Sequence, residues 1–243
     1  MIQKFTADGH PLLSFGDPLL KSPWGIALDS GGGIYVIDAL RNSIFIFAPE
    51  GQRLREIRSR GGRVFDNPLQ VVVDDSGALF VTEHYGGSIH RISALGRREK
   101  SWGSWRLENM QPGEFRHVLA IALDASGFVY IADVNNARVQ KFTRDGEYVL
   151  HWPLETAPQP LPDWCDLAVF RDFVLILDAS PPGTLQVWTK DGQAARNISL
   201  EGRLHDWRGS NAKSIPHLTV NERGDLFILD TSTRRVLRFR INF

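Results

Sequence analysis

Two polar residues of this chain, Asp166 and His217, have side chains that could serve acid–base chemistry or ligand binding. A carboxylate beside an imidazole orients the ring and shifts its pKa. Such a pair can equally be two buried groups that satisfy each other's hydrogen bonds. The two residues are far apart in the sequence, but they hold the same position in adjacent copies of the repeat described below, so we expect the fold to bring them to one level.

A second set of acidic residues closes short β-rich runs along the chain: Asp38, Glu83, Asp133, Asp178 and Asp230. A ring of carboxylates of this kind could bind a metal ion, but each copy of the pattern has its acid at the same position. An Asp that follows a strand readily accepts backbone hydrogen bonds and fixes the next turn. We therefore expect these acids to be structural, and predict neither a metal ligand nor a cofactor.

The composition limits the remaining chemistry. Lys plus Arg equals Asp plus Glu at 28 each, so no overall field attracts nucleic acid or an acidic membrane surface. The single Cys165 excludes an internal disulfide and a zinc site built from cysteines. No apolar stretch is long enough to cross a bilayer, and residues 1–9 are not a signal peptide. No Ser-His-Asp order, phosphate loop or paired-carboxylate motif stands out, and the compartment stays undefined.

The elements that must position these residues form a repeat. Its clearest copy reads AIALD at 120–124, VYIAD at 129–133, VQKF at 139–142 and, after a TRDG turn, EYVLHW at 147–152. Each run is short, β-rich and closed by turn residues. The same order recurs over 25–47, 70–92, 166–188 and 217–239. A four-stranded meander cannot bury both of its faces alone, so the copies must stack around an axis.

The glycine of one turn stands at a fixed distance from the third strand of each copy. Four apolar residues, Ile44, Ile89, Val139 and Leu185, each lie seven residues before a glycine. Asp-Gly pairs favour a tight hairpin turn because glycine tolerates a positive φ without steric cost. The offset therefore indicates antiparallel hairpins in a common register.

The succession of Pro, GIALD, Gly, IYVID, an apolar run and a turn glycine resembles the NHL repeat, over nearly the whole chain. The resemblance implies an all-β fold, a β-propeller of four-stranded antiparallel blades forming one domain over residues 1–243. The copies predict five blades, closed by pairing Pro11–Phe15 with the C-terminal blade. Residues 1–5 read as a surplus third strand, and NHL-type propellers often have six blades. A truncated six-bladed propeller is therefore the alternative.

In propellers of this family, ligands usually bind at the loops around the mouth of the central channel. The copies place these ligand-binding candidates in such loops or near the start of a first strand: Arg41, His84, Tyr85, Trp105, Trp164, Asp166, Trp207, His217 and Arg234. The three tryptophans among them suit a binding rim. Trp152 and Trp188 lie within strands and are expected in the core.

Three resemblances bear on function. Peptidyl-amidating lyases carry Pro-His before their first strands to bind zinc, but only Pro216-His217 matches here, and a three-histidine site needs three blades. Some NHL domains bind single-stranded RNA on a basic face; here acidic residues share the arginine-containing loops, which disfavours nucleic acid. Residues 207–230 resemble propeller tails of some bacterial membrane glycosyltransferases, which implies a membrane-anchored parent protein.

We interpret the chain as a non-catalytic binding or scaffold module that presents a propeller rim to a protein, peptide or glycan. One alternative is a propeller lyase or hydrolase, metal-dependent or not, that uses His217 and Asp166. The other is RNA binding through an arginine-rich face. We assign no catalytic residue.

Overall fold

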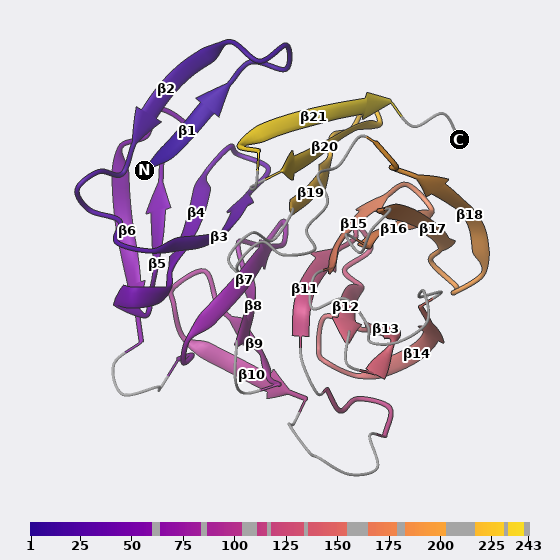
Figure 1. The fold of residues 1–243 in the computed structure, drawn as a ribbon. Helices are drawn as coiled ribbons and strands as arrows, with labels where there is room; N and C mark the ends of the chain where they lie inside the picture. Colours follow the sequence, from indigo (N-terminus) through magenta and orange to yellow (C-terminus); the bar gives the residue numbers. More distant parts are fainter. Residues whose placement is uncertain are drawn as a thin grey trace. The chain divides into compact units, whose positions relative to one another are not determined.

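The computed structural model describes residues 1–59, 64–83, 87–103, 111–115, 118–133, 136–154, 165–178, 183–202, 217–230 and 233–240. It divides into two compact units, Met1–Gly103 and Ser104–Phe243, each of which is described by itself. Both consist of antiparallel sheets, which confirms the all-β prediction (Figure 1). A short 3-10 turn, η1 (Ala39–Arg41), interrupts the strands of the first unit. The prediction of one domain over 1–243 stays a prediction.

The first unit contains a hairpin and two four-stranded meanders. The hairpin pairs β1 (Ile2–Phe5) with β2 (Pro11–Phe15). Blade 1 consists of β3 (Pro23–Leu28), β4 (Ile34–Asp38), β5 (Ser43–Phe47) and β6 (Arg53–Arg58). Blade 2 consists of β7 (Pro68–Val73), β8 (Leu79–Glu83), β9 (Ile89–Ile92) and β10 (Arg98–Trp102).

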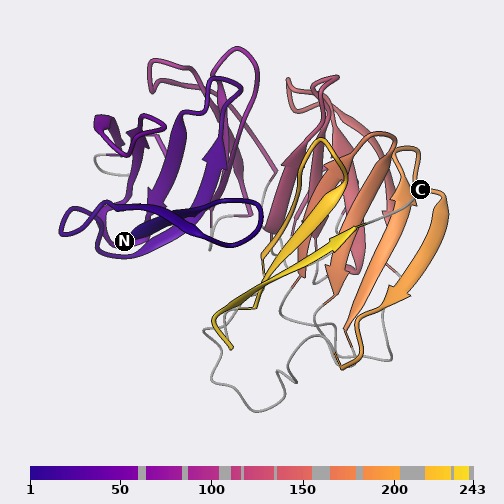
Figure 2. The same ribbon diagram turned by 90° about the horizontal axis from the view of Figure 1, so that it is seen from above.

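The second unit contains three further sheets, which lie face to face in Figure 2. Blade 3 consists of β11 (Val118–Leu123), β12 (Val129–Asp133), β13 (Arg138–Phe142) and β14 (Tyr148–Pro153). Blade 4 consists of β15 (Cys165–Phe170), β16 (Phe173–Asp178), β17 (Thr184–Thr189) and β18 (Ala194–Ser199). Blade 5 has three strands among the described residues, β19 (His217–Val220), β20 (Asp225–Asp230) and β21 (Arg235–Arg240).

The apolar faces of the sheets hold each unit together. Between blades 1 and 2 the core contains Ile37, Ile44, Val71 and Leu79. Between blades 4 and 5 the corresponding core contains Leu177, Leu185, Leu218 and Ile228. Burying such side chains removes apolar surface from water, which is the main stabilising contribution to a stack of this kind. Trp152 and Trp188 are buried as predicted, at 3% and 5% exposure, with ring centroids 6.3 Å apart.

The turn glycines have the positive φ that the repeat predicts, and two of them are in close contact with the preceding blade. Gly51, Gly96, Gly146 and Gly192 all have positive φ, between 76° and 83°. A Cβ added to Gly96 would come within 3.2 Å of Ile57, and one added to Gly192 would come within 3.0 Å of Trp152. Both neighbours lie on the outer strand of the preceding blade, so glycine at the turn lets that strand approach closely.

The N-terminal hairpin has the same relation to blade 1. A Cβ on Gly51 would come within 2.8 Å of Phe15, and Phe15 packs against Phe47 with ring centroids 5.1 Å apart. Residues 2–5 and 11–15 therefore pack on blade 1 as the third and fourth strands of a preceding blade would. Pro11–Phe15 pairs with Ile2–Phe5, and its predicted pairing with the C-terminal blade stays a prediction.

Candidate functional site

Asp166 and His217 lie at one level on the first strands of two neighbouring sheets, blades 4 and 5. Asp166 pairs with Leu177 in blade 4, and His217 pairs with Leu229 in blade 5. Each partner is the residue before the acid that closes the second strand. Oδ2 of Asp166 is 3.4 Å from Nδ1 of His217. The structure thus brings together the two residues that the sequence predicted to be neighbours.

The carboxylate of Asp166 is fixed by the backbone of both strands. Its Oδ1 accepts a hydrogen bond from the N–H of Leu167 at 2.9 Å, and its Oδ2 accepts one from the N–H of Leu218 at 2.8 Å. The residue is 4% exposed. Three donors from two strands therefore converge on one buried carboxylate, which ties blade 4 to blade 5 and sets the orientation of the imidazole.

His217 is more accessible than its partner, with 35% of its side chain exposed. Burial alone would lower the pKa of His217, but the hydrogen bond and the negative charge of Asp166 outweigh it and raise the pKa above its ordinary value. Since Nδ1 is directed at Asp166, Nε2 is the ring nitrogen left for a ligand. The arrangement favours a protonated imidazole that donates a hydrogen bond.

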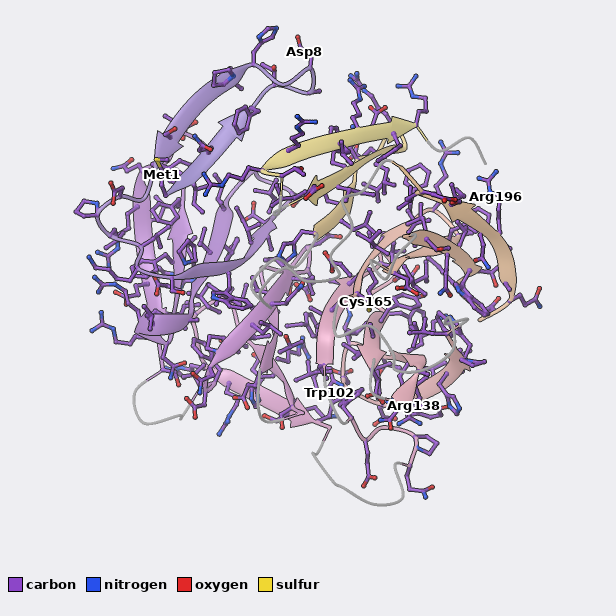
Figure 3. The ribbon with its side chains drawn as sticks, in the orientation of Figure 1. Met1, Asp8, Trp102, Arg138, Cys165 and Arg196 are labelled. Carbon is purple, nitrogen blue, oxygen red and sulfur yellow. The ribbon has the colours of Figure 1, made fainter. Side chains whose placement is uncertain are left out.

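Cys165 precedes Asp166 in β15 and lies inside the second unit, where it is labelled in Figure 3. The thiol is buried. Burial, together with the negative charges of Asp166 and Asp178, raises the pKa of Cys165 well above its ordinary value. A thiol held in its neutral form is a poor nucleophile, so Cys165 contributes packing to this site rather than reactivity.

The acids that close the second strands fix turns, as predicted, in part of the series. Asp38 accepts hydrogen bonds from the backbone N–H groups of Ser22 and Arg41, at 3.2 and 3.1 Å, and Asp230 accepts one from Thr233 at 3.0 Å. Asp133 binds side chains as well, with the guanidinium Nε of Arg138 at 2.9 Å. The series is therefore a structural set that individual blades have modified.

Blade 2 contains a second histidine–carboxylate pair, which the sequence reasoning missed. Nε2 of His90 is 2.6 Å from Oε1 of Glu83, and Nδ1 of His90 is 2.7 Å from Oγ of Ser101. His90 is 4% exposed. A signal was present, because strand alternation places His90 among buried positions where a polar residue needs a partner.

The other candidate residues are spread among loops. Arg41 ends η1, and Asn42 after it adopts a left-handed conformation with φ 49°. Arg234 also has a positive φ of 57°. His84, Tyr85, Trp105, Trp164 and Trp207 lie outside the described residues, so their predicted place on a rim stays a prediction.

The side chains and helices of the described ranges bear on two other classes of site. Within those ranges, no three His, Cys, Asp or Glu side chains come together as metal ligands. No helix there has the length and apolar character needed to cross a membrane.

Comparisons with known proteins agree with the repeat. The NHL repeat family matches residues 20–47 and 115–142, which contain the first three strands of blades 1 and 3. The mouse NHL repeat-containing protein 3 is 27% identical over 95% of this chain, which spans 66% of that protein. Peptidyl-glycine alpha-amidating monooxygenase B of Xenopus laevis is 31% identical over 57% of this chain, but over only 17% of its own length.

Among solved structures, a streptogramin B lyase superposes with a TM-score of 0.63, covering 96% of this chain and 70% of the lyase. The sequence identity is 17%, so this likeness concerns the fold alone. Together with the repeated four-stranded meanders and their turn glycines, the matches identify NHL repeats in this chain and support its assignment to the NHL-repeat β-propeller family.

Proposed function

We propose that the site around His217 is a non-catalytic binding site and that His217 is a contact to its protein, peptide or glycan ligand. The observation that carries the proposal is the way in which the carboxylate of Asp166 is held between two strands and beside His217. Its carboxylate accepts hydrogen bonds from two backbone N–H groups and lies beside the imidazole, whose pKa it raises. A histidine held in this way keeps its proton to a higher pH than an ordinary histidine, and the protonated ring donates a hydrogen bond from Nε2.

A donor of this kind fits oxygen acceptors. Peptide carbonyls, side-chain carboxylates and sugar hydroxyls all offer them, and a charged donor forms stronger hydrogen bonds than a neutral one. Propellers of NHL repeats commonly mediate protein interactions. The exposed fraction of His217, 35% of its side chain, leaves room for such a contact.

The test is a binding screen on defined peptide and glycan arrays with the full chain. We expect His217→Gln to weaken binding of any ligand found by at least about tenfold, because a neutral amide replaces a charged donor. His151 provides a matched control, since it lies exposed on the outer strand β14 of the same unit, and His151→Gln should bind like the wild type. Unchanged binding by the His217 variant would exclude this histidine as a ligand contact.

The same geometry favours one competing function, a lyase or hydrolase. An imidazole oriented by a carboxylate is also the arrangement of a general base, and the match to amidating enzymes over 57% of this chain adds support. The two functions differ in what happens to the ligand. Chemical conversion of a captured ligand, lost in His217→Gln, or stoichiometric zinc in the purified protein, would favour the enzyme.

A further inference from the structure

Three polar residues of blade 2 form a relay across three neighbouring strands. Glu83 ends β8, His90 lies in β9 and Ser101 lies in β10, directly opposite His90 in the strand register. The imidazole joins the other two, with 2.6 Å from Nε2 to Glu83 and 2.7 Å from Nδ1 to Ser101. We infer that this relay is a nucleophilic site for acyl esters, with Ser101 as the nucleophile. The inference is independent of the binding role of His217.

Burial changes along the relay in the direction that nucleophilic catalysis requires. Ser101 is exposed, whereas the side chains of His90 and Glu83 are 5% and 13% exposed. A nucleophile must be reachable by a substrate, while the base that activates it must be held in one orientation. Both conditions are met here, because Ser101 is an exposed residue and the imidazole is enclosed.

Glu83 fixes which nitrogen of the imidazole carries the proton. Burial alone would raise the pKa of Glu83, but hydrogen bonds from His90 and from the N–H of Asp66 outweigh it and lower the pKa below its ordinary value. The N–H of Asp66 is 2.6 Å from the same oxygen. An ionised carboxylate can only accept, so Nε2 donates to Glu83, and Nδ1 is left to accept the hydroxyl proton of Ser101.

Other blades have different residues at the position equivalent to His90. The residue at the place of His90 is Phe45 in blade 1, Gln140 in blade 3 and Gln186 in blade 4. Gln140 uses its amide to hold the loop before blade 3, donating to the carbonyl of Glu114 at 2.9 Å. An apolar residue or a glutamine therefore suffices for the scaffold. Blade 2 instead has a titratable base opposite a hydroxyl.

The chemistry follows a balanced acyl transfer. Oγ of Ser101 bonds to the carbonyl carbon of an ester, and its proton passes to Nδ1 of His90. When the tetrahedral intermediate collapses, the ester C–O bond breaks and the alcohol leaves with the proton from His90. Water, activated by the same nitrogen, then releases the acid and restores the serine.

The oxyanion of the intermediate requires a hydrogen-bond donor. Among the described strands of blade 2, β10 lies at one edge of the sheet. The backbone of an edge strand can offer N–H groups to a ligand, and donors of this kind stabilise an oxyanion. Glu83 does not touch the substrate in this scheme, so we assign it as a positioning residue.

The test uses the full chain with p-nitrophenyl acetate and with a fluorophosphonate probe, whose attachment site is mapped by mass spectrometry. We expect the probe on Ser101, no label there in Ser101→Ala, and at least about a hundredfold slower labelling and hydrolysis in His90→Gln. Glutamine already occupies this register in blades 3 and 4, so the variant should melt close to the wild type. Ser199 is an exposed serine on the outer strand β18 of blade 4, and Ser199→Ala is the matched control.

A separate experiment must show that Glu83 positions His90 for catalysis and does not only stabilise the fold. Glu83→Gln should slow labelling by at least about tenfold, and Glu83→Asp should recover part of the rate, because a carboxylate is restored. Absence of a label on wild-type Ser101 under excess probe would overturn the inference, as would equal labelling of the wild type and a folded His90→Gln. In either case the Ser101 contact would be a cross-strand hydrogen bond only.

Discussion

The two histidine–carboxylate pairs of this protein differ in which member is buried and which group is left exposed. In the Asp166–His217 pair, the carboxylate is the buried and fixed member, bound by backbone N–H groups of two sheets, and the imidazole is partly exposed. In the Glu83–His90 pair, the imidazole is buried within one sheet and both of its nitrogens have partners. The first pair presents a histidine to solvent, and the second presents a hydroxyl. The member that the fold anchors decides which group is left for chemistry.

The largest expected effect comes from removing the anchored carboxylate. Asp166→Ala leaves the N–H groups of Leu167 and Leu218 without their acceptor in a buried place, which should lower the free energy of unfolding by about 3 kcal/mol. Urea unfolding of the full chain measures it. Asp191→Ala is the control, because that side chain is 82% exposed, and it should change little. A loss below about 1 kcal/mol for Asp166→Ala would show that the carboxylate does not tie the two sheets.

Removal of the anchored imidazole should cost less. His90→Leu keeps an apolar side chain in the sheet but deprives Glu83 of its hydrogen-bond donor, so we expect a loss of about 2 kcal/mol in the free energy of unfolding. His10→Leu, at a position where the side chain is 78% exposed, provides the comparison. Equal stability of the two variants would contradict the anchoring role of His90.

The exposed histidine should matter for stability only when it is protonated. Because the folded pKa of His217 is raised, its contribution is fully present below the ordinary histidine pKa and is lost as the pH rises through the folded value. The gap in unfolding free energy between the wild type and His217→Gln should be about 0.5 kcal/mol at acidic pH, since solvent screens a pair with this exposure. It should close at alkaline pH. A gap that widened with pH would reverse the assignment.

The smallest expected effect on stability is that of the presented hydroxyl. Ser101 is exposed, so Ser101→Ala should change the free energy of unfolding by less than about 0.5 kcal/mol. The same variant is expected to abolish probe labelling. Unfolding curves and labelling measured on one preparation separate the two readouts. A large stability loss would indicate that the hydroxyl belongs to the scaffold.

The repeat made much of the fold predictable, along with one of the two pairs. Strand order and turn positions follow from the fixed offset between the third strand and its glycine, and the same register placed Asp166 and His217 at one level. The position of each residue within its copy of the repeat was enough to predict the contact between them. Their functional role is a different matter, because five of the rim candidates lie outside the described residues.

The relay in blade 2 could not be predicted in the same way. The pairing of β10 with β9 shifts between Arg98 and Lys100, and this irregularity sets Ser101 opposite His90. Counting residues from the turn glycine does not reveal a bulge, since a shift of one residue moves a side chain to the other face. The N-terminal hairpin posed a similar problem, because the pattern identified both strands but not their place beside blade 1.

Gly25 occupies in β3 the level that Asp166 and His217 occupy in their own first strands. A Cβ at this position would stand 2.8 Å from the carbonyl oxygen of Leu69 in β7, so any other residue would force the two strands apart. At this level blade 1 therefore has no room for a functional side chain, whereas blades 4 and 5 accommodate a carboxylate and an imidazole.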